Sequence, residues 1–216
     1  SYSTYADLGT STLDGGTAAV GSVSIACLSC HDGTQAMDNI INAPGSGNYI
    51  ADGNGTAGRG YSWTNGGSGT LNADTDGKLG GLNTSIITLI GTDLKNDHPI
   101  GIQYAGGPAV TISATYGEST SDFRDTDFKA IADTDDDHDS GTSWWVDIDS
   151  DGTRQKDEMI LYTRTATSLA NGTAGSDSTD QPFVECASCH DPHSENTTFL
   201  RISNTGSAVC LACHSK

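Results

Sequence analysis

The sequence predicts a mostly irregular fold with few short helices and a few short β-strands. Only 34% of the 216 residues are hydrophobic and 6% are aromatic, whereas 27 are glycine. The apolar segments are short, and stretches rich in Gly, Asn, Ser and Thr separate them, which indicates loops. A chain this polar buries too little apolar side-chain surface to offset the conformational entropy that it loses on folding. Another apolar component is therefore expected in the core.

The whole chain, 1–216, is interpreted as one domain of short elements joined by polar loops. The hairpin is expected because Trp144 to Ile148 and Met159 to Thr163 flank an acidic turn. The expected elements are an apolar segment at 20–25, a long loop at 43–82, a helix at 85–90, a strand at 110–116, a β-hairpin at 143–164 and a polar loop at 165–181.

Cysteine occurs only in pairs with two residues between them, and histidine follows each pair. Two thiols at this spacing can add to the vinyl groups of one haem, and the following imidazole then lies where it can bind the iron. All six cysteines follow this pattern, so the sequence predicts three covalently bound haem c groups that also supply apolar core. The motifs are Cys27-Leu-Ser-Cys30-His31, Cys186-Ala-Ser-Cys189-His190 and Cys210-Leu-Ala-Cys213-His214.

Other uses of the cysteines explain the pattern less well. The two C-terminal pairs have the spacing of a zinc ribbon, but this interpretation leaves Cys27, Cys30 and the three adjacent histidines unexplained. Disulfides within CxxC loops would be short and strained. A thioredoxin-like pair would occur once and in a βαβ context.

Three further histidines, His98, His138 and His193, give one spare imidazole for each haem. Equal numbers predict bis-histidine ligation, which closes both axial positions of each iron. Such haems suit electron transfer, so no enzymatic activity is expected. Surface histidines are the alternative, above all for His138, which has acidic neighbours.

The position of His193, three residues after His190, restricts which iron it can bind. It cannot reach the opposite face of the haem tethered by its own motif, because its backbone lies on the proximal side. It is therefore expected to serve a different haem, preferably that of Cys210 and Cys213, which would bring two haems close together. His98 precedes Pro99, a helix stop that presents an imidazole rigidly.

An acidic turn inside the expected hairpin has the spacing of a calcium loop. Carboxylates at its first, third, fifth and twelfth positions can surround one Ca²⁺, and a glycine at the sixth makes the turn. Strand-like flanks predict a calcium-bound hairpin turn rather than a pair of EF-hands, and an acidic surface turn is the alternative. The residues are Asp147, Asp149, Asp151, Gly152 and Glu158.

The formal charge of −18 argues against nucleic acid and anionic membranes as partners, because both require clusters of Lys and Arg. No apolar run approaches the roughly 18 residues of a membrane span. Ser1 begins a polar stretch without a basic leader, and we interpret it as the start of an exported, processed chain.

Four blocks resemble outer-surface multihaem c-type cytochromes with a doubled CxxCH motif, especially subunits of extracellular cytochrome nanowires. The resemblance implies a loop-dominated, haem-cored fold with bis-His haems in a line and subunits joined head to tail. It also implies that a neighbouring subunit can donate one distal histidine, here His138 or His98. Known members carry more than three haems, so this chain departs from them. The blocks are 26–34, 96–101, 184–193 and 208–214.

The expected function is therefore electron transfer by an extracellular filament subunit, to redox partner proteins or external acceptors. A monomeric periplasmic electron shuttle is the main alternative. A multihaem reductase would need an open iron, against which the equal numbers of spare histidines and haems argue. A zinc- and calcium-stabilised adhesin would need the zinc interpretation of the cysteines.

Overall fold

The computed structural model describes residues 1–9, 15–34, 89–107, 120, 123–133, 143–165 and 180–215. The expected loop at 43–82, the strand at 110–116 and His138 lie outside the described residues, as do most of the helix at 85–90 and of the loop at 165–181. The chain divides into two compact units, which are described separately. The smaller unit comprises Ser1–Ser3 and Ile25–Asp97, and the larger comprises Thr4–Ser24 and His98–Lys216.

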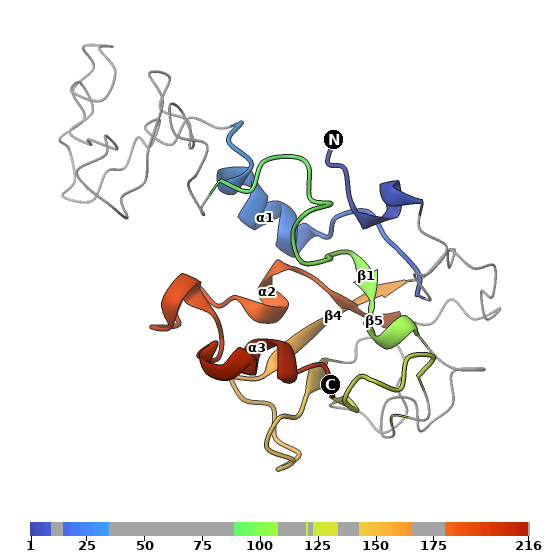
Figure 1. Cartoon of the computed structure of the whole chain (residues 1–216), viewed down its shortest axis with the longest axis vertical. Coiled ribbons are helices and arrows are strands. Elements are labelled where there is room, and N and C mark those ends of the chain that lie inside the picture. Colours follow the sequence, from blue (N-terminus) through green and yellow to red (C-terminus); the bar gives the residue numbers. More distant parts are fainter. Residues whose placement is uncertain are drawn as a thin grey trace. The chain divides into compact units, whose positions relative to one another are not determined.

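The helices are short (Figure 1), and the first cysteine of each CxxCH motif lies on one of them, whereas the third motif extends past the end of its helix. The α-helices are α1 (Ser22–His31), α2 (Cys186–Cys189) and α3 (Ala208–Leu211). The 3₁₀ turns are η1 (Tyr5–Leu8), η3 (Tyr104–Gly106), η5 (Thr197–Phe199) and η6 (Thr205–Ser207). No helix within the described residues has the length and apolar character that a membrane crossing needs.

Five short strands form one antiparallel sheet in the order β1-β5-β4-β3-β2. Figure 1 labels β1, β5 and β4 of this sheet. Strands β3 and β4 form a hairpin at the predicted place, with Trp145 paired to Ile160. The strands are β1 (Ile102–Gln103), β2 (Ala132–Asp133), β3 (Trp144–Val146), β4 (Met159–Thr165) and β5 (Asp180–Val184). The prediction of a mostly irregular chain with few short helices and strands is confirmed.

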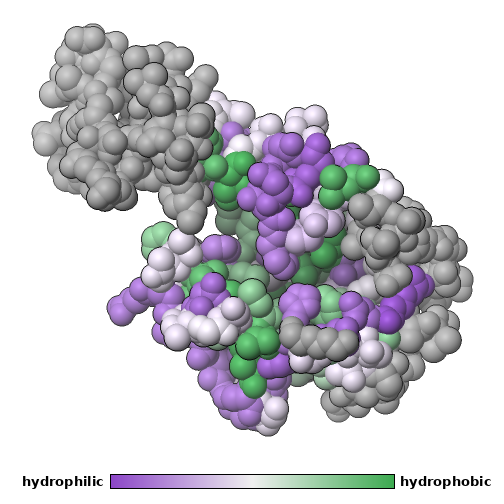
Figure 2. Space-filling model, viewed as in Figure 1, coloured by the Kyte–Doolittle hydropathy of each residue, from purple (hydrophilic) through white to green (hydrophobic). Residues whose placement is uncertain are grey.

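The core of the larger unit is a cluster of buried aromatic and aliphatic side chains on this sheet. The Tyr104 ring meets Phe123 and Phe128 edge to face, with centroids 5.6 and 5.2 Å apart. Cys189 and Cys213 pack against the same cluster, so two of the three motifs are built onto the core. Figure 2 shows that other apolar groups stay at the surface as separate patches among polar residues.

In the smaller unit the end of α1 is bound to the segment around residue 90. The His31 carbonyl accepts hydrogen bonds from the backbone N of Ile90 at 2.9 Å and Gly91 at 3.2 Å. Leu28, between the two cysteines of this motif, has no exposed surface. The first motif is therefore held by buried apolar surface and by its own backbone.

Candidate haem sites

The three CxxCH motifs present their thiols from helical turns. Residues three apart in a helix project from the same side, so each pair of thiols can reach one flat group. All six cysteines are free thiols, as covalent attachment requires. Within the described residues, the four C-terminal cysteines do not gather into a group of three or more ligand atoms within 4.8 Å of one another.

At the first motif, the residue after His31 is fixed by side-chain hydrogen bonds. Asp32 accepts hydrogen bonds from the Thr34 backbone N at 2.8 Å and from the Tyr2 hydroxyl at 2.8 Å. Burial disfavours the charged carboxylate, but these hydrogen bonds outweigh it and lower the pKa of Asp32. Burial also raises the pKa of the Cys27 thiol.

At the second motif, a backbone carbonyl orients the imidazole that follows the cysteines. His190 Nδ1 lies 2.8 Å from the Thr198 carbonyl oxygen, so the protonated Nδ1 donates and Nε2 keeps its lone pair. Metal-binding histidines are commonly oriented by such a hydrogen bond on the other ring nitrogen. His190 and Leu200 also pair as an isolated antiparallel bridge. The side chain is thus prepared to bind iron through Nε2.

A buried carboxylate precedes the second motif. Glu185 accepts hydrogen bonds from Ser24 Oγ and from Arg164 Nη1, the latter at 2.7 Å, and its side chain is 1% exposed. Ser24 Oγ also lies 2.9 Å from the backbone N of Cys186, the first residue of α2. The start of α2 is therefore fixed to Ser24 and to strand β4.

At the third motif, backbone contacts hold the chain on both sides of the second cysteine. The Cys213 carbonyl accepts hydrogen bonds from the Lys129 backbone N at 2.8 Å and from the Tyr104 hydroxyl at 3.3 Å. The ring of His214 lies 4.3 Å from the ring of Phe128, centroid to centroid. Cys210 is exposed, whereas Cys213 is partly buried.

The second and third motifs are close in space. Burial raises the pKa of Cys189 to about 11, and the charge of Cys210 adds to this rise. Burial raises the pKa of Cys213 to about 12, and the charge of Cys189 adds to it. Thiols affect each other in this way only at short range in a poorly solvated setting. Cys189 and Cys213 also pack against one core cluster, so two pairs that are twenty residues apart in the sequence meet at the same core.

Of the three spare histidines, His98 is found near the third motif. Its ring is accessible, yet the surrounding protein excludes enough water to lower its pKa, and the charge of His214 lowers it further. Its Nδ1 lies 3.1 Å from the Pro99 carbonyl, so Nε2 is available as a ligand. His193 is exposed, and its backbone N donates to Asp191 Oδ1 at 2.9 Å.

Apolar side chains at the motifs fit a large apolar cofactor. Among the described residues, four large hydrophobic side chains are exposed, and three of these lie at the motifs. Ile25 is 48% exposed and lies two residues before Cys27, and Leu211 is 44% exposed between Cys210 and Cys213. Phe199, beside the carbonyl that orients His190, is 57% exposed. A haem at each motif would cover such surface.

The predicted calcium loop brings three of its carboxylates together. Ligand oxygens of Asp147, Asp149 and Asp151 lie within 4.8 Å of one another. Glu158 is 3% exposed and accepts hydrogen bonds from the backbone N of Ile148 at 3.2 Å and of Gln155 at 2.8 Å. The fourth predicted carboxylate is therefore bound to the backbone of the loop.

Burial and hydrogen bonding act in opposite directions on the carboxylates of this loop. Burial disfavours the charge of Asp147, but hydrogen bonds from the backbone of Gly152, Ser150 and Asp151 lower its pKa overall. Burial raises the pKa of Glu158 despite its backbone hydrogen bonds. Gly152 has φ +72°, a conformation that favours glycine at the turn.

Several residues of the site could not be found by sequence reasoning alone. Glu185, Arg164 and Ser24 meet across long sequence distances, and Arg201 contacts the second motif from the far side of a loop. None of them belongs to a spaced motif. The sequence feature that could have drawn attention to Arg201 is its positive charge, because the chain has only 10 Lys and Arg against 28 Asp and Glu.

Comparison with known proteins supports the interpretation of the C-terminal motifs. Residues 181–216 match the Doubled CXXCH motif family. No curated protein matches the chain. The matched region contains α2, α3 and the segment that orients His190, so the family model and the geometry identify the same site. The doubled motif indicates covalently bound haem c, and with it an electron-transfer cytochrome.

Proposed function

We propose that this protein carries three haem c groups, one at each motif, and passes electrons between them without catalysing a reaction of its own. When bound, each haem supplies an iron that exchanges one electron between its Fe(III) and Fe(II) forms. The observation that carries the proposal is the orientation of His190, whose Nδ1 lies 2.8 Å from a backbone carbonyl in a motif with two free thiols.

The proximity of the second and third motifs supports a short electron path in the larger unit. Cys189 and Cys213 pack on one core cluster, and the charge of Cys189 raises the pKa of Cys213. Two haems attached at these positions would be neighbours. Neighbouring haems exchange electrons without a diffusing carrier, which suits a relay protein.

We further propose that His98 is the distal ligand of the haem held by Cys210 and Cys213. The charge of His214 lowers the pKa of His98, so the two imidazoles lie near each other in one unit. The Pro99 carbonyl, 3.1 Å from Nδ1 of His98, leaves Nε2 available for an iron. Under this assignment, His193 and His138 are candidate ligands for the other two haems.

The proposal extends to assembly outside the cell. The resemblance of four sequence blocks to nanowire subunits supports a head-to-tail polymer that passes electrons to redox proteins or external acceptors. The exposed side chains of Ile25, Phe199 and Leu211 lie beside the motifs, where a neighbouring subunit would also meet them. A periplasmic shuttle would be monomeric, so oligomeric state separates the two functions.

We also propose that the protein binds one Ca²⁺ in the turn between β3 and β4. The clustered oxygens of Asp147, Asp149 and Asp151 support this, because Ca²⁺ prefers several carboxylate oxygens around it. Bound calcium would offset the repulsion between these carboxylates. It would thereby stabilise the β3–β4 hairpin, which carries the buried Trp144 and Trp145.

Haem content and spin state of the purified protein test the electron-transfer function. Mass spectrometry and a pyridine haemochrome assay should give three haems per chain, and electron paramagnetic resonance should show low-spin, bis-His iron. Zinc without iron would refute the haem proposal, and a high-spin majority would indicate a reductase.

Electron microscopy of the secreted fraction should show filaments, and discrete particles at every concentration would refute the polymer.

A further inference from the structure

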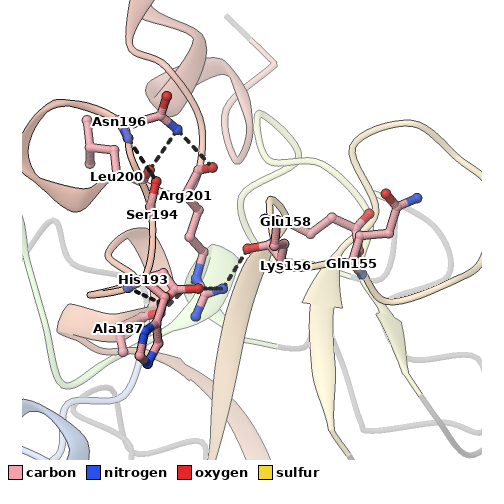
Figure 3. A network of polar contacts seen from close by, with 10 residues as sticks. Gln155, Lys156, Glu158, Ala187, His193, Ser194, Asn196, Leu200 and Arg201 are labelled. Carbon is pink, nitrogen blue, oxygen red and sulfur yellow. Dashed lines mark hydrogen bonds and ion pairs between the residues drawn. The ribbon is translucent and has the colours of Figure 1, made fainter.

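The side chain of Arg201 connects the second CxxCH motif to the turn that precedes strand β4 (Figure 3). Its Nε donates to the carbonyl oxygen of Ala187, inside the motif, at 3.1 Å. Its Nη1 donates to the carbonyl oxygen of Lys156, just before β4, at 2.8 Å. The same Nη1 lies 3.8 Å from Oδ2 of Asp191. One guanidinium group therefore contacts the motif, the residue after its histidine and the hairpin.

The backbone around Arg201 runs alongside the same motif. The backbone N of Arg201 donates to the Cys189 carbonyl at 2.8 Å, and that of Asp191 donates to the Phe199 carbonyl at 2.8 Å. Between these bonds, the Thr198 carbonyl accepts the hydrogen bond from His190 Nδ1. The segment that carries Arg201 therefore also sets the orientation of the iron-binding imidazole.

Side chains within the loop hold this segment in place (Figure 3). Ser194 Oγ donates to the Leu200 carbonyl at 2.6 Å, and Asn196 Nδ2 donates to the carbonyls of Leu200 at 2.9 Å and Arg201 at 3.2 Å. Thr198 has φ +57°, a left-handed conformation that is strained for a side chain of this kind. Such a conformation persists where surrounding contacts hold it. The same contacts therefore fix the position of Arg201.

The charge of Arg201 acts in a poorly solvated place. Its side chain is only 11% exposed, and that of Asp191 is 21% exposed. Charges interact more strongly where water is excluded, and the screening by salt is weaker there. The charge of Arg201 lowers the pKa of the Cys189 thiol, against the larger effect of burial. The same charge would act on a charge that develops at an iron held by this motif.

We propose that Arg201 is a positioning residue that holds the second CxxCH motif and raises the reduction potential of the haem attached there. The physical reason is that oxidation places an additional positive charge on the iron, and a nearby fixed cation disfavours it. Asp191 partly compensates this cation, so the two residues set the potential in opposite directions. This inference rests on the proposed haem attachment at Cys186 and Cys189.

The test uses the full-length, haem-loaded protein in spectroelectrochemical redox titrations, with each midpoint assigned to its haem by nuclear magnetic resonance. Arg201→Gln should lower the midpoint of the second haem, and Asp191→Asn should raise it. Asp191→Asn keeps the Oδ1 acceptor for the His193 backbone N, so it changes charge with little change of shape. Arg201→Lys should retain most of the potential while weakening the contacts to Ala187 and Lys156.

Arg154→Gln is the matched control, because it removes one positive charge from an exposed residue of the same unit. It should shift the midpoint of the second haem less than Arg201→Gln does. If Arg201→Gln yields no folded protein, Asp191→Asn decides the question alone. The inference would be overturned if Arg201→Gln and Asp191→Asn shift the midpoint potential of the second haem no more than Arg154→Gln does. It would also be overturned if Asp191→Asn lowers that potential.

The haem content of each variant separates this inference from the proposed function. Three haems per chain with unshifted midpoints would refute only the role of Arg201. Absence of haem from the wild-type second motif would refute the proposed function itself. A loss of that haem in Arg201→Gln alone would support the positioning role.

Discussion

Glu185 Oε1 lies 2.7 Å from Arg164 Nη1, and this ion pair directly precedes the second haem-binding motif. The carboxylate is 1% exposed and the guanidinium 26%, so the pair lies at the edge of the core rather than at the surface. Ser24 and Gly21 donate further hydrogen bonds to the same carboxylate. Glu185 therefore connects α2 to the start of α1 and to β4.

Glu185→Gln should destabilise the protein. The substitution keeps the shape of the side chain but removes the charge that Arg164 compensates, so we expect a loss of about 1–3 kcal/mol in the free energy of unfolding. Urea unfolding followed by circular dichroism measures it. Asp93→Asn is the control, because Asp93 is 64% exposed in its 3.5 Å ion pair with Lys95 and should change stability by less than about 1 kcal/mol. Equal losses in both variants would contradict the prediction.

His98→Ala should convert one haem of three from low spin to high spin. Loss of the distal imidazole leaves the iron of the third motif with His214 as its protein ligand. Electron paramagnetic resonance should show a high-spin signal from a single haem per chain, and added imidazole should reverse it. His193→Ala is the matched comparison and should affect a different haem, so that the double variant shows two. Fully low-spin iron in His98→Ala would refute the pairing.

Calcium should raise the melting temperature of the protein, and Asp151→Asn should reduce this effect. At a calcium concentration about 100 times the dissociation constant, binding stabilises the folded state by about 2.7 kcal/mol. Differential scanning calorimetry with calcium and with a chelator measures it. Asp157→Asn, an exposed residue of the same loop outside the ligand positions, removes the same charge and should keep the response. An equal response in Asp151→Asn would contradict the site.

The same carboxylates predict how stability depends on pH without calcium. The pKa of Asp147 is lowered by folding, so its contribution is present above its ordinary value of 3.8 and disappears as the pH falls below it. The pKa of Glu158 is raised, so stability declines as the pH rises past its ordinary value of 4.5. Glu158→Gln should flatten this decline, as measured by chelator-treated unfolding curves between pH 4 and 7.

Gly101→Ala should be far more harmful than alanine at another glycine of similar backbone conformation. Gly101 has φ +66°, and a Cβ there would lie 2.7 Å from the carbonyl oxygen of Ala18. Gly9 has φ +61° with no atom within 4 Å, so Gly9→Ala should cost only about 1 kcal/mol for the left-handed conformation. Thermal unfolding of both variants decides it, and equal melting temperatures would show that the close approach is unimportant.

The sequence predicted the features that depend on neighbouring residues. The CxxCH motifs indicate candidate haem sites because attachment requires a fixed local spacing, and the acidic turn between aromatic and aliphatic segments indicated the β3–β4 hairpin. Long-range contacts were not predictable. Glu185 meets Ser24 across 161 residues, and β1 pairs with β5 through residues far apart in the chain. Such pairs depend on the packed fold, and the short apolar segments carry no periodicity that would specify it.

The amino-acid composition did not predict the side-chain core of the larger unit. Aromatic residues are few, but Tyr104, Phe123 and Trp144 are gathered in one cluster with the two C-terminal motifs. A percentage averaged over the chain cannot show this concentration. Haem was expected to compensate for a weak core, and the structure shows a side-chain core onto which two of the attachment sites are built.

The partial burial of Cys189 and Cys213 bears on when haem can be attached to these two motifs. Thioether formation requires a nucleophilic sulfur, and thiols with pKa values of about 11 and 12 are almost entirely protonated near neutral pH. A chain that closed around these thiols before maturation would react slowly with an incoming macrocycle. Attachment of haem is therefore favoured on the still open polypeptide, before the sheet closes around the two cysteines.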